Sequence, residues 1–124
     1  MKGVGGLIKF YCYPKCSTCQ NAKKWLDQNG VDYEEIHIVE KHPSKEDLSE
    51  FYKKSGLSIH KFFNTSGIKY REMGLSSKVK TTAVDELLEL LATDGMLVKR
   101  PIVTDGKKVT VGFKSEVFAE NWLK

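Results

Sequence analysis

The stretch that decides the fold runs from Leu7 to Gly30 and reads LIKFYCYPKCSTCQNAKKWLDQNG. Its beginning, residues 7–11, is a near-continuous apolar run, which predicts a strand buried on both faces. Pro14 ends this strand. Apolar residues then recur at helical spacing, which predicts an amphipathic helix that Gly30 stops. The chain therefore opens with a strand, a turn and a helix.

A Cys-x-x-Cys motif occupies the turn, where Ser17 and Thr18 separate Cys16 from Cys19. Serine and threonine favour helix N-caps, which places Cys16 at or just before the first turn of the helix. Unpaired backbone N–H groups and the helix dipole favour an anion there over a neutral thiol. We therefore expect Cys16 to have a lowered pKa and to act as a nucleophile.

Positive charge near the motif supports the same expectation. Lys15 precedes Cys16, and Lys23 lies further along the predicted helix. Cys19 lies three residues after Cys16 on the same helical face, within disulfide reach if the turn is tight. We interpret Cys16 as the attacking thiol and Cys19 as the resolving thiol.

Two other interpretations of the motif stay open at this point. A lone Cys-x-x-Cys can be half of a zinc site, and a cysteine can also be a small buried apolar residue. Zinc needs a second ligand pair, and the remaining candidates show no paired spacing: Cys12, His37, His42 and His60. A redox role is favoured over a metal site because the strand-turn-helix context is typical of a redox motif.

Length and composition are those of one globular domain. The chain has 124 residues, of which 40% are hydrophobic and 29% are charged, which is enough for a real core. Its net charge of +4 is scattered, which supports nucleic-acid binding only weakly and membrane binding not at all. Three cysteines are too few for a secreted disulfide scaffold, and residues 1–6 do not resemble a signal peptide. We expect a cytoplasmic protein with a frayed beginning.

The next part of the chain predicts a second strand and a capped helix. The strand lies within residues 31–39 and runs parallel to the first, because a helix connects the two. His37 in this strand is interpreted as a solvent-facing residue. Ser44 and Asp47 form a capping-box pattern at the start of a helix that Gly56 ends.

Short helices and a hairpin fill the rest. Helical pieces are predicted at 59–63 and 70–73, followed by a helix that Thr82 starts and Gly95 closes. Two strands, residues 102–104 and 109–111, are joined by an Asp105-Gly106 turn, the strongest hairpin signal in the chain. Ser115 caps the last predicted helix.

Four blocks of sequence together resemble the glutaredoxin-type arsenate reductase family, to which the redox-sensing regulator Spx also belongs. The blocks are residues 16–19 (CSTC), 70–75 (YREMGL), 99–103 (KRPIV) and 112–116 (GFKSE). The resemblance runs from about Leu7 to the C-terminus. It implies an α/β, thioredoxin-like fold with a mixed four-stranded sheet and an inserted helical segment.

The resemblance also implies how a single domain, residues 1–124, is divided. A thioredoxin-like core covers about residues 7–40 and 96–124, and a helical insertion covers about residues 44–95. In this fold the proline before the third strand is commonly cis and packs against the nucleophile. The same is therefore expected of Pro101.

Arg100 is the residue that this proline is expected to aim at the nucleophile. There it would hold an oxyanion or lower the pKa of Cys16 further. The alternative interpretation of Arg100 is a surface arginine before a rigid turn.

The sequence departs from the family's pattern where three arginines are expected. The one four residues after the nucleophile is Gln20. The second is replaced within residues 62–65, although Arg71 lies nearby, and the third by Phe113, beside Lys114. A tetrahedral oxyanion needs charge-assisted donors, each of which contributes about 1.5–3 kcal/mol. We therefore expect inefficient arsenate reduction.

Cys19 is an addition relative to those family members that rely on one cysteine and glutathione. It implies an internal disulfide that thioredoxin, or glutaredoxin with glutathione, could reduce. Cys12 lies inside the apolar run and is interpreted as a buried structural thiol, with a third redox role as the alternative.

Two functions follow from the resemblance. The first is a thiol-disulfide oxidoreductase in which Cys16 attacks, Cys19 resolves and Arg100 stabilises negative charge. The second is a Spx-like regulator that binds the RNA polymerase α-subunit and has no DNA-reading motif of its own. Neither function requires a cofactor. The residues expected to contact the substrate are Pro101, Ser17 and Thr18.

Overall fold

The computed structural model describes residues 8–123. Leu7 and the expected frayed beginning lie outside the described residues. The chain forms two compact units. The first contains the part up to His37 together with the part from Arg100 onward, and the second is Ile38–Lys99. The division of one domain into a core and an insertion at the boundaries given above stays a prediction.

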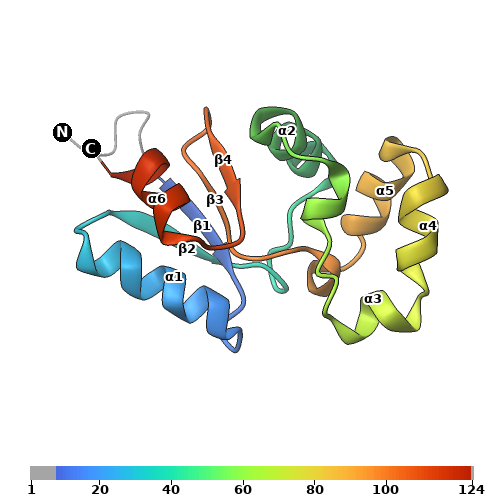
Figure 1. Cartoon of the computed structure of the whole chain (residues 1–124), viewed down its shortest axis with the longest axis horizontal. Helices are drawn as coiled ribbons and strands as arrows, with labels where there is room; N and C mark the ends of the chain where they lie inside the picture. The colour runs from blue at the N-terminus through green and yellow to red at the C-terminus, as the bar shows by residue number, and fades with distance from the viewer. Residues whose placement is uncertain (1–7, 124) are drawn as a thin grey trace. The chain divides into compact units, whose positions relative to one another are not determined.

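The first unit contains a mixed four-stranded sheet, as the sequence predicts (Figure 1). Its strands are β1 (Ile8–Cys12), β2 (Tyr33–His37), β3 (Ile102–Thr104) and β4 (Val109–Val111), in the order β2-β1-β3-β4. β1 and β2 are parallel, and β3 is antiparallel to both of its neighbours. In β1, Phe10, Tyr11 and Cys12 are buried, whereas Ile8 is half-buried and Lys9 is exposed.

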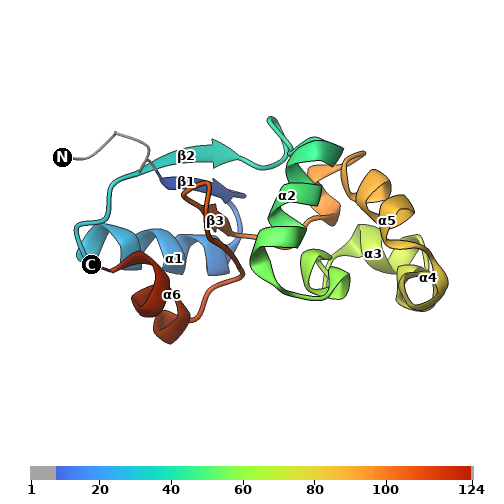
Figure 2. The same cartoon turned by 90° about the horizontal axis from the view of Figure 1, so that it is seen from above.

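Two helices, α1 (Ser17–Gln28) and α6 (Ser115–Trp122), lie on the same face of this sheet (Figures 1 and 2). Phe10 and Cys12 point to that face because alternate residues of a strand share a side. A single buried cluster joins sheet and helices: Phe10, Cys12, Cys19, Ala22, Leu26, Val103, Phe118 and Trp122. The two cysteines in this cluster connect the core directly with the motif in the turn.

The end of α1 confirms the stop predicted at Gly30. Gly30 has a φ of +66°, the left-handed conformation that glycine adopts without a steric cost. Its N–H donates to the Asp27 carbonyl at 3.2 Å, and the Val31 N–H donates to the Leu26 carbonyl at 2.9 Å. These two bonds form a Schellman motif, so the helix ends with its last carbonyls satisfied.

The predicted hairpin is confirmed, with the strand bounds expected and a four-residue loop that begins with Asp105 and Gly106. Thr104 pairs with Val109, which leaves residues 105–108 as the loop. The Asp105 carboxylate accepts the backbone N–H groups of Lys107 and Lys108, each at 2.9 Å. The aspartate therefore orders the loop after the strand ends.

The second unit contains helices joined by short connections (Figure 1). They are α2 (Lys45–Ser55), η1 (Ile59–Phe62), α3 (Ile68–Glu72), α4 (Leu75–Thr81), α5 (Val84–Leu91) and η2 (Gly95–Leu97). The predicted capping box is confirmed, since Ser44 and Asp47 exchange both hydrogen bonds at the start of α2. α4 was not predicted. No helix within residues 8–123 is long and apolar enough to cross a membrane.

Three predicted helix caps are wrong by one or two residues. The N-caps are Cys16 in place of Ser17 or Thr18, Ala83 in place of Thr82, and Lys114 in place of Ser115. All three observed caps have extended backbone, and none is a serine, threonine, aspartate or asparagine. The backbone enters these helices where the preceding connection allows it, so a favourable cap residue nearby does not decide the position.

The predicted role of Gly95 is also wrong. α5 already ends at Leu91, and Gly95 is a buried residue of η2. A Cβ atom at this position would lie 2.1 Å from the Ile38 carbonyl oxygen. Glycine is needed here because two backbone segments approach closely.

Candidate active site

Cys16 is the N-cap of α1 and lies immediately before the first helical turn, as the sequence predicts. β1 ends at Cys12, and a turn follows in which the Cys16 N–H donates to the Tyr13 carbonyl at 3.0 Å. No acidic residue lies in the first turn of α1. The half-buried thiol therefore faces a helix N-terminus whose partial positive charge is not neutralised by a carboxylate.

The surroundings of Cys16 favour its thiolate. Burial is the largest influence on its pKa and acts to raise it, but hydrogen bonds acting together outweigh burial. The donors are the backbone N–H of Cys19, the Arg100 guanidinium, the Cys19 thiol and the backbone N–H of Thr18. The pKa of Cys16 is therefore lowered, in the direction predicted from the sequence.

Cys19 has the opposite environment. Its side chain is buried, and its sulfur accepts the Tyr13 N–H at 3.3 Å. Burial, reinforced by the negative charge at Cys16, raises the pKa of Cys19 to about 12. The surroundings thus lower the pKa of one cysteine of the motif and raise that of the other.

Arg100 belongs to the site although it is distant from the Cys-x-x-Cys motif in the sequence. It precedes Pro101, and the Arg100–Pro101 peptide bond is cis, which confirms the prediction made for Pro101. The guanidinium carbon lies 5.0 Å from the centroid of the Tyr13 ring. Arg100 therefore contacts an aromatic face and, as described above, donates to Cys16.

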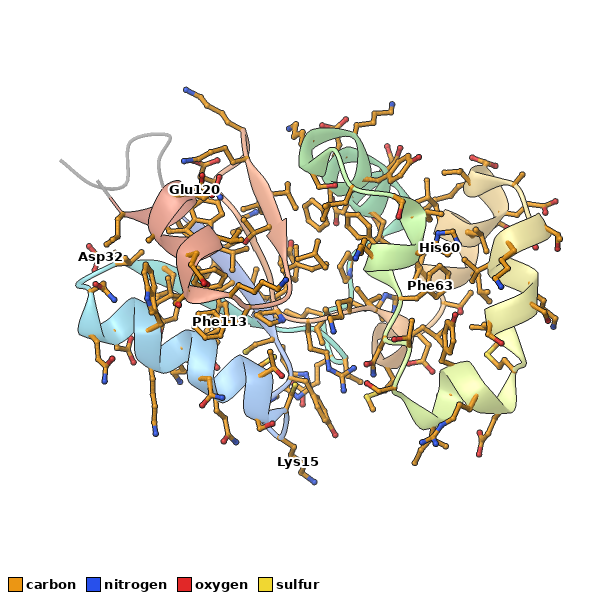
Figure 3. All side chains as sticks on the ribbon, viewed as in Figure 1. Lys15, Asp32, His60, Phe63, Phe113 and Glu120 are labelled. Atoms are coloured by element: carbon orange, nitrogen blue, oxygen red, sulfur yellow. The ribbon has the colours of Figure 1, made fainter. Side chains whose placement is uncertain are left out.

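Of the two lysines expected to charge the site, neither is a hydrogen-bond donor to Cys16. Lys15 is exposed, and its side chain extends away from the body of the protein (Figure 3). Lys23 forms an ion pair with Glu35, with an N–O distance of 2.9 Å. The side-chain cation that donates to Cys16 is Arg100.

Cys12 is buried and held as a neutral thiol, as the structural interpretation predicts. Burial, together with a hydrogen bond from its thiol to the Glu35 carboxylate at 3.3 Å, raises the pKa of Cys12 to about 12. The ion pair with Lys23 lowers the pKa of Glu35 and keeps that carboxylate ionised. A buried thiol with such a high pKa is a poor nucleophile at neutral pH.

The residues that stand where the family's arginines are expected make structural contacts. The Gln20 side chain donates to the Pro14 carbonyl at 2.9 Å and braces the turn before Cys16. The Phe113 ring, labelled in Figure 3, packs edge-to-face on Phe118 with centroids 4.7 Å apart. Phe62 and Phe63 are buried in the second unit. Neither Gln20 nor Phe113 supplies a cation. Within the described part of the first unit, Arg100 is the one arginine.

The remaining predicted site residues lie next to these groups in the chain. Ser17 is exposed, Thr18 is half-buried and Pro101 is buried. Among residues 8–123 no group of three or more histidine, cysteine, aspartate or glutamate side chains could hold a metal ion. Sequence reasoning missed Tyr13, whose contacts with Cys19 and Arg100 depend on a fold that brings distant segments together.

A cysteine at the N-terminus of the helix that connects two parallel strands, together with a cis-proline before the third strand, defines a protein with a thioredoxin-like fold. A sequence model described as the ArsC family matches residues 11–121. The chain belongs to the ArsC family, which confirms the family suggested by the sequence blocks.

Relatives by sequence include proteins named as regulators. YusI of Bacillus subtilis (strain 168), whose name assigns no function, is 61% identical over 115 residues, 93% of this chain and 98% of the relative. The regulatory protein MgsR of the same organism is 29% identical, covering 86% of this chain and 82% of the relative. The global transcriptional regulator Spx 2 of Bacillus anthracis is 23% identical, covering 89% and 82%.

Solved structures with the same fold include an arsenate reductase. An ArsC family related protein from Bacteroides fragilis matches with a TM-score of 0.89 and 49% identity, covering 91% of this chain and 95% of that one. The arsenate reductase from Vibrio cholerae matches with a TM-score of 0.81 and 26% identity, covering 91% and 95%. The relatives thus include both an enzyme and transcriptional regulators.

Proposed function

We propose that this protein is a cytoplasmic thiol-disulfide oxidoreductase with Cys16 as nucleophile and Cys19 as resolving thiol. The observation that carries the proposal is the contrast between the two sulfurs. Cys16 is half-buried with a lowered pKa, whereas Cys19 is buried with a pKa raised to about 12. A reducing compartment suits a pair that must return to the dithiol state after each cycle.

The reaction begins when the Cys16 thiolate attacks one sulfur of a disulfide substrate and expels the other as a thiolate. Cys19 then loses its proton and attacks the Cys16 sulfur, which releases the second half of the substrate as a thiolate. Two thiols are oxidised to a Cys16–Cys19 disulfide, and one substrate disulfide is reduced to two thiols. Thioredoxin, or glutaredoxin with glutathione, supplies the two electrons that restore the pair.

The high pKa of Cys19 suits this order of events. A neutral buried thiol does not compete for the substrate, so the first attack is directed to Cys16. Arg100 stabilises negative charge on Cys16 before the attack, and again when reduction of the Cys16–Cys19 disulfide returns Cys16 as a thiolate. Pro101, Ser17 and Thr18 neighbour these residues in the chain, and we assign them to substrate contact.

Arsenate is a poor candidate substrate. An oxyanion of this kind is bound by several charge-assisted donors, each of which contributes about 1.5–3 kcal/mol. Gln20 and Phe113 occupy two of the family's arginine positions, and both have structural contacts. We expect disulfides to be reduced far better than arsenate.

The test is turnover of a glutathionylated peptide disulfide, with thioredoxin or glutaredoxin as reductant. We expect Cys16→Ser to abolish turnover, and Cys19→Ser to accumulate a mixed disulfide that mass spectrometry detects on Cys16. Cys12→Ser is the matched control and should retain turnover. Absence of turnover in the wild-type protein, with this disulfide or arsenate and with either reductant, would contradict the proposal.

A redox-sensing regulator is the second candidate, because relatives named MgsR and Spx cover most of this chain. In this function the Cys16–Cys19 disulfide is the signal, and binding to the RNA polymerase α-subunit is the output. Capture of the purified α-subunit by the oxidised protein, lost on reduction and in Cys16→Ser, would favour the regulator. Equal capture in both redox states would count against it.

A further inference from the structure

The backbone of Tyr13 contacts both cysteines of the motif. Its N–H donates to the Cys19 sulfur at 3.3 Å, and its carbonyl accepts the Cys16 N–H at 3.0 Å. Tyr13 directly follows the end of β1. A single residue at the end of the strand therefore holds the Cys19 sulfur and the Cys16 backbone.

The Tyr13 ring contacts two further residues, one at the end of β2 and one shortly before β3. The Arg100 guanidinium carbon lies 5.0 Å from the ring centroid, within the roughly 6 Å range of a cation–π contact. The His37 ring, at the end of β2, meets Tyr13 with centroids 5.8 Å apart and planes at 82°. His37 thus packs against the Tyr13 ring, and the Arg100 guanidinium lies over the face of the same ring.

Arg100 needs such a support because its side chain is long and flexible. An arginine loses rotamer freedom when it is held in one geometry, so its donation to a thiolate is stronger when another contact already orders it. The Tyr13 ring is such a contact.

We infer that Tyr13 is the positioning residue of this site: its ring holds the Arg100 guanidinium beside Cys16, while its backbone holds the Cys19 sulfur and the Cys16 backbone. The inference rests on the proposed function of Cys16 as the nucleophile. It concerns the ring, because the backbone contacts remain when the side chain is replaced.

The measurement is the alkylation rate of Cys16 by iodoacetamide as a function of pH, in the reduced full-length protein. It reports the fraction of thiolate and needs no substrate. The titratable and charged groups involved are Cys19 and Arg100 at Cys16, and His37 at Tyr13. His37 and Cys19 are unchanged in every variant.

The variants form a double-mutant cycle: Tyr13→Leu, Arg100→Met and the two combined. We expect Tyr13→Leu to shift the profile toward higher pH and to slow alkylation at pH 7 by about two- to fivefold, the range of one cation–π contact. Arg100→Met should slow it at least as much, and the double variant no more than Arg100→Met alone. Tyr13→Phe keeps an aromatic face and should keep the wild-type profile.

Two results would overturn the inference. In one, Tyr13→Leu leaves the profile unchanged; in the other, it slows alkylation as much in the Arg100→Met background as in the wild type. Thermal unfolding identifies a variant that does not fold, in which case Tyr13→Gln replaces Tyr13→Leu. A protein without turnover but with these shifts would contradict the proposed function and still support the positioning role.

Discussion

The starts of α1 and α2 have similar backbones and different chemistry. Both N-cap residues, Cys16 and Ser44, are extended, and both are followed by regular helix. Ser44 accepts the Asp47 N–H at 3.0 Å, and the Asp47 carboxylate accepts the Ser44 N–H at 3.2 Å. Cys16 has no capping box, and its thiolate is favoured by backbone N–H groups of the first turn and by Arg100.

The charge in the first turn separates the two helix starts further. α2 has Glu46 and Asp47 there, whereas α1 has no acidic residue. Carboxylates at a helix N-terminus neutralise its partial positive charge, so little remains to stabilise another anion. A helix N-terminus therefore becomes a stable cap or a reactive site according to the side chains around it. The helix dipole alone does not make the site at Cys16.

The largest expected effect is selective alkylation of the reduced protein at neutral pH. Cys16 has a lowered pKa, whereas Cys12 and Cys19 are buried with pKa values raised to about 12. We expect Cys16 to react about 100-fold faster or more than either buried thiol, after allowing for the greater nucleophilicity of high-pKa thiolates. Peptide mapping by mass spectrometry measures the three rates. Comparable rates in the native protein would mean that burial does not protect Cys12 and Cys19.

A cysteine placed at the start of α2 tests whether a helix N-terminus is sufficient. The variant is Ser44→Cys in a Cys16→Ser background. Because Glu46 and Asp47 oppose a thiolate there, we expect the introduced thiol to react about tenfold slower than Cys16 does in the wild type. Adding Glu46→Gln should recover part of the difference. An introduced thiol as reactive as Cys16 would show that the first-turn charge and Arg100 contribute little.

The features that were predictable from sequence depend on neighbours in the chain. The capping box at Ser44 and Asp47, the Schellman end at Gly30 and the hairpin loop after Asp105 all form within a few residues. The parallel pairing of β1 and β2 follows from the helix that connects them. Cys16 and Cys19 were predictable for the same reason, since the motif lies in a single turn.

The features that were missed depend on contacts between distant segments. Gly95 was mistaken for a helix stop because its contact with the Ile38 carbonyl joins residues far apart in sequence. α4 was missed because two buried residues, Leu75 and Val79, are too few to define a helical pattern. The Tyr13 contact with Arg100 likewise depends on the sheet that brings β1 and β3 together.

Removal of the α2 cap should affect stability and leave the thiol chemistry intact. Ser44→Ala removes the acceptor for the Asp47 N–H, and loss of such a cap costs about 1 kcal/mol of the free energy of unfolding. Urea denaturation of the reduced protein measures this change. The alkylation rate of Cys16 should remain at its wild-type value, and a slower rate would indicate that the two helix starts are coupled.

The smallest expected effect is a pH-dependent contribution of Cys16 to stability. Its pKa is lower in the folded than in the unfolded protein, so the thiolate stabilises the fold fully above the unfolded value, about 8.5. This stabilisation is lost as the pH decreases through the lowered folded value. The raised pKa values of Cys12 and Cys19 act with the opposite sign, and both thiols remain in Cys16→Ser. The wild-type free energy of unfolding relative to Cys16→Ser should therefore decrease by about 0.3–1 kcal/mol from pH 9 to acidic pH, as for one anion at a helix N-terminus. A difference that is constant with pH would mean that α1 stabilises no thiolate, and its start would then resemble that of α2.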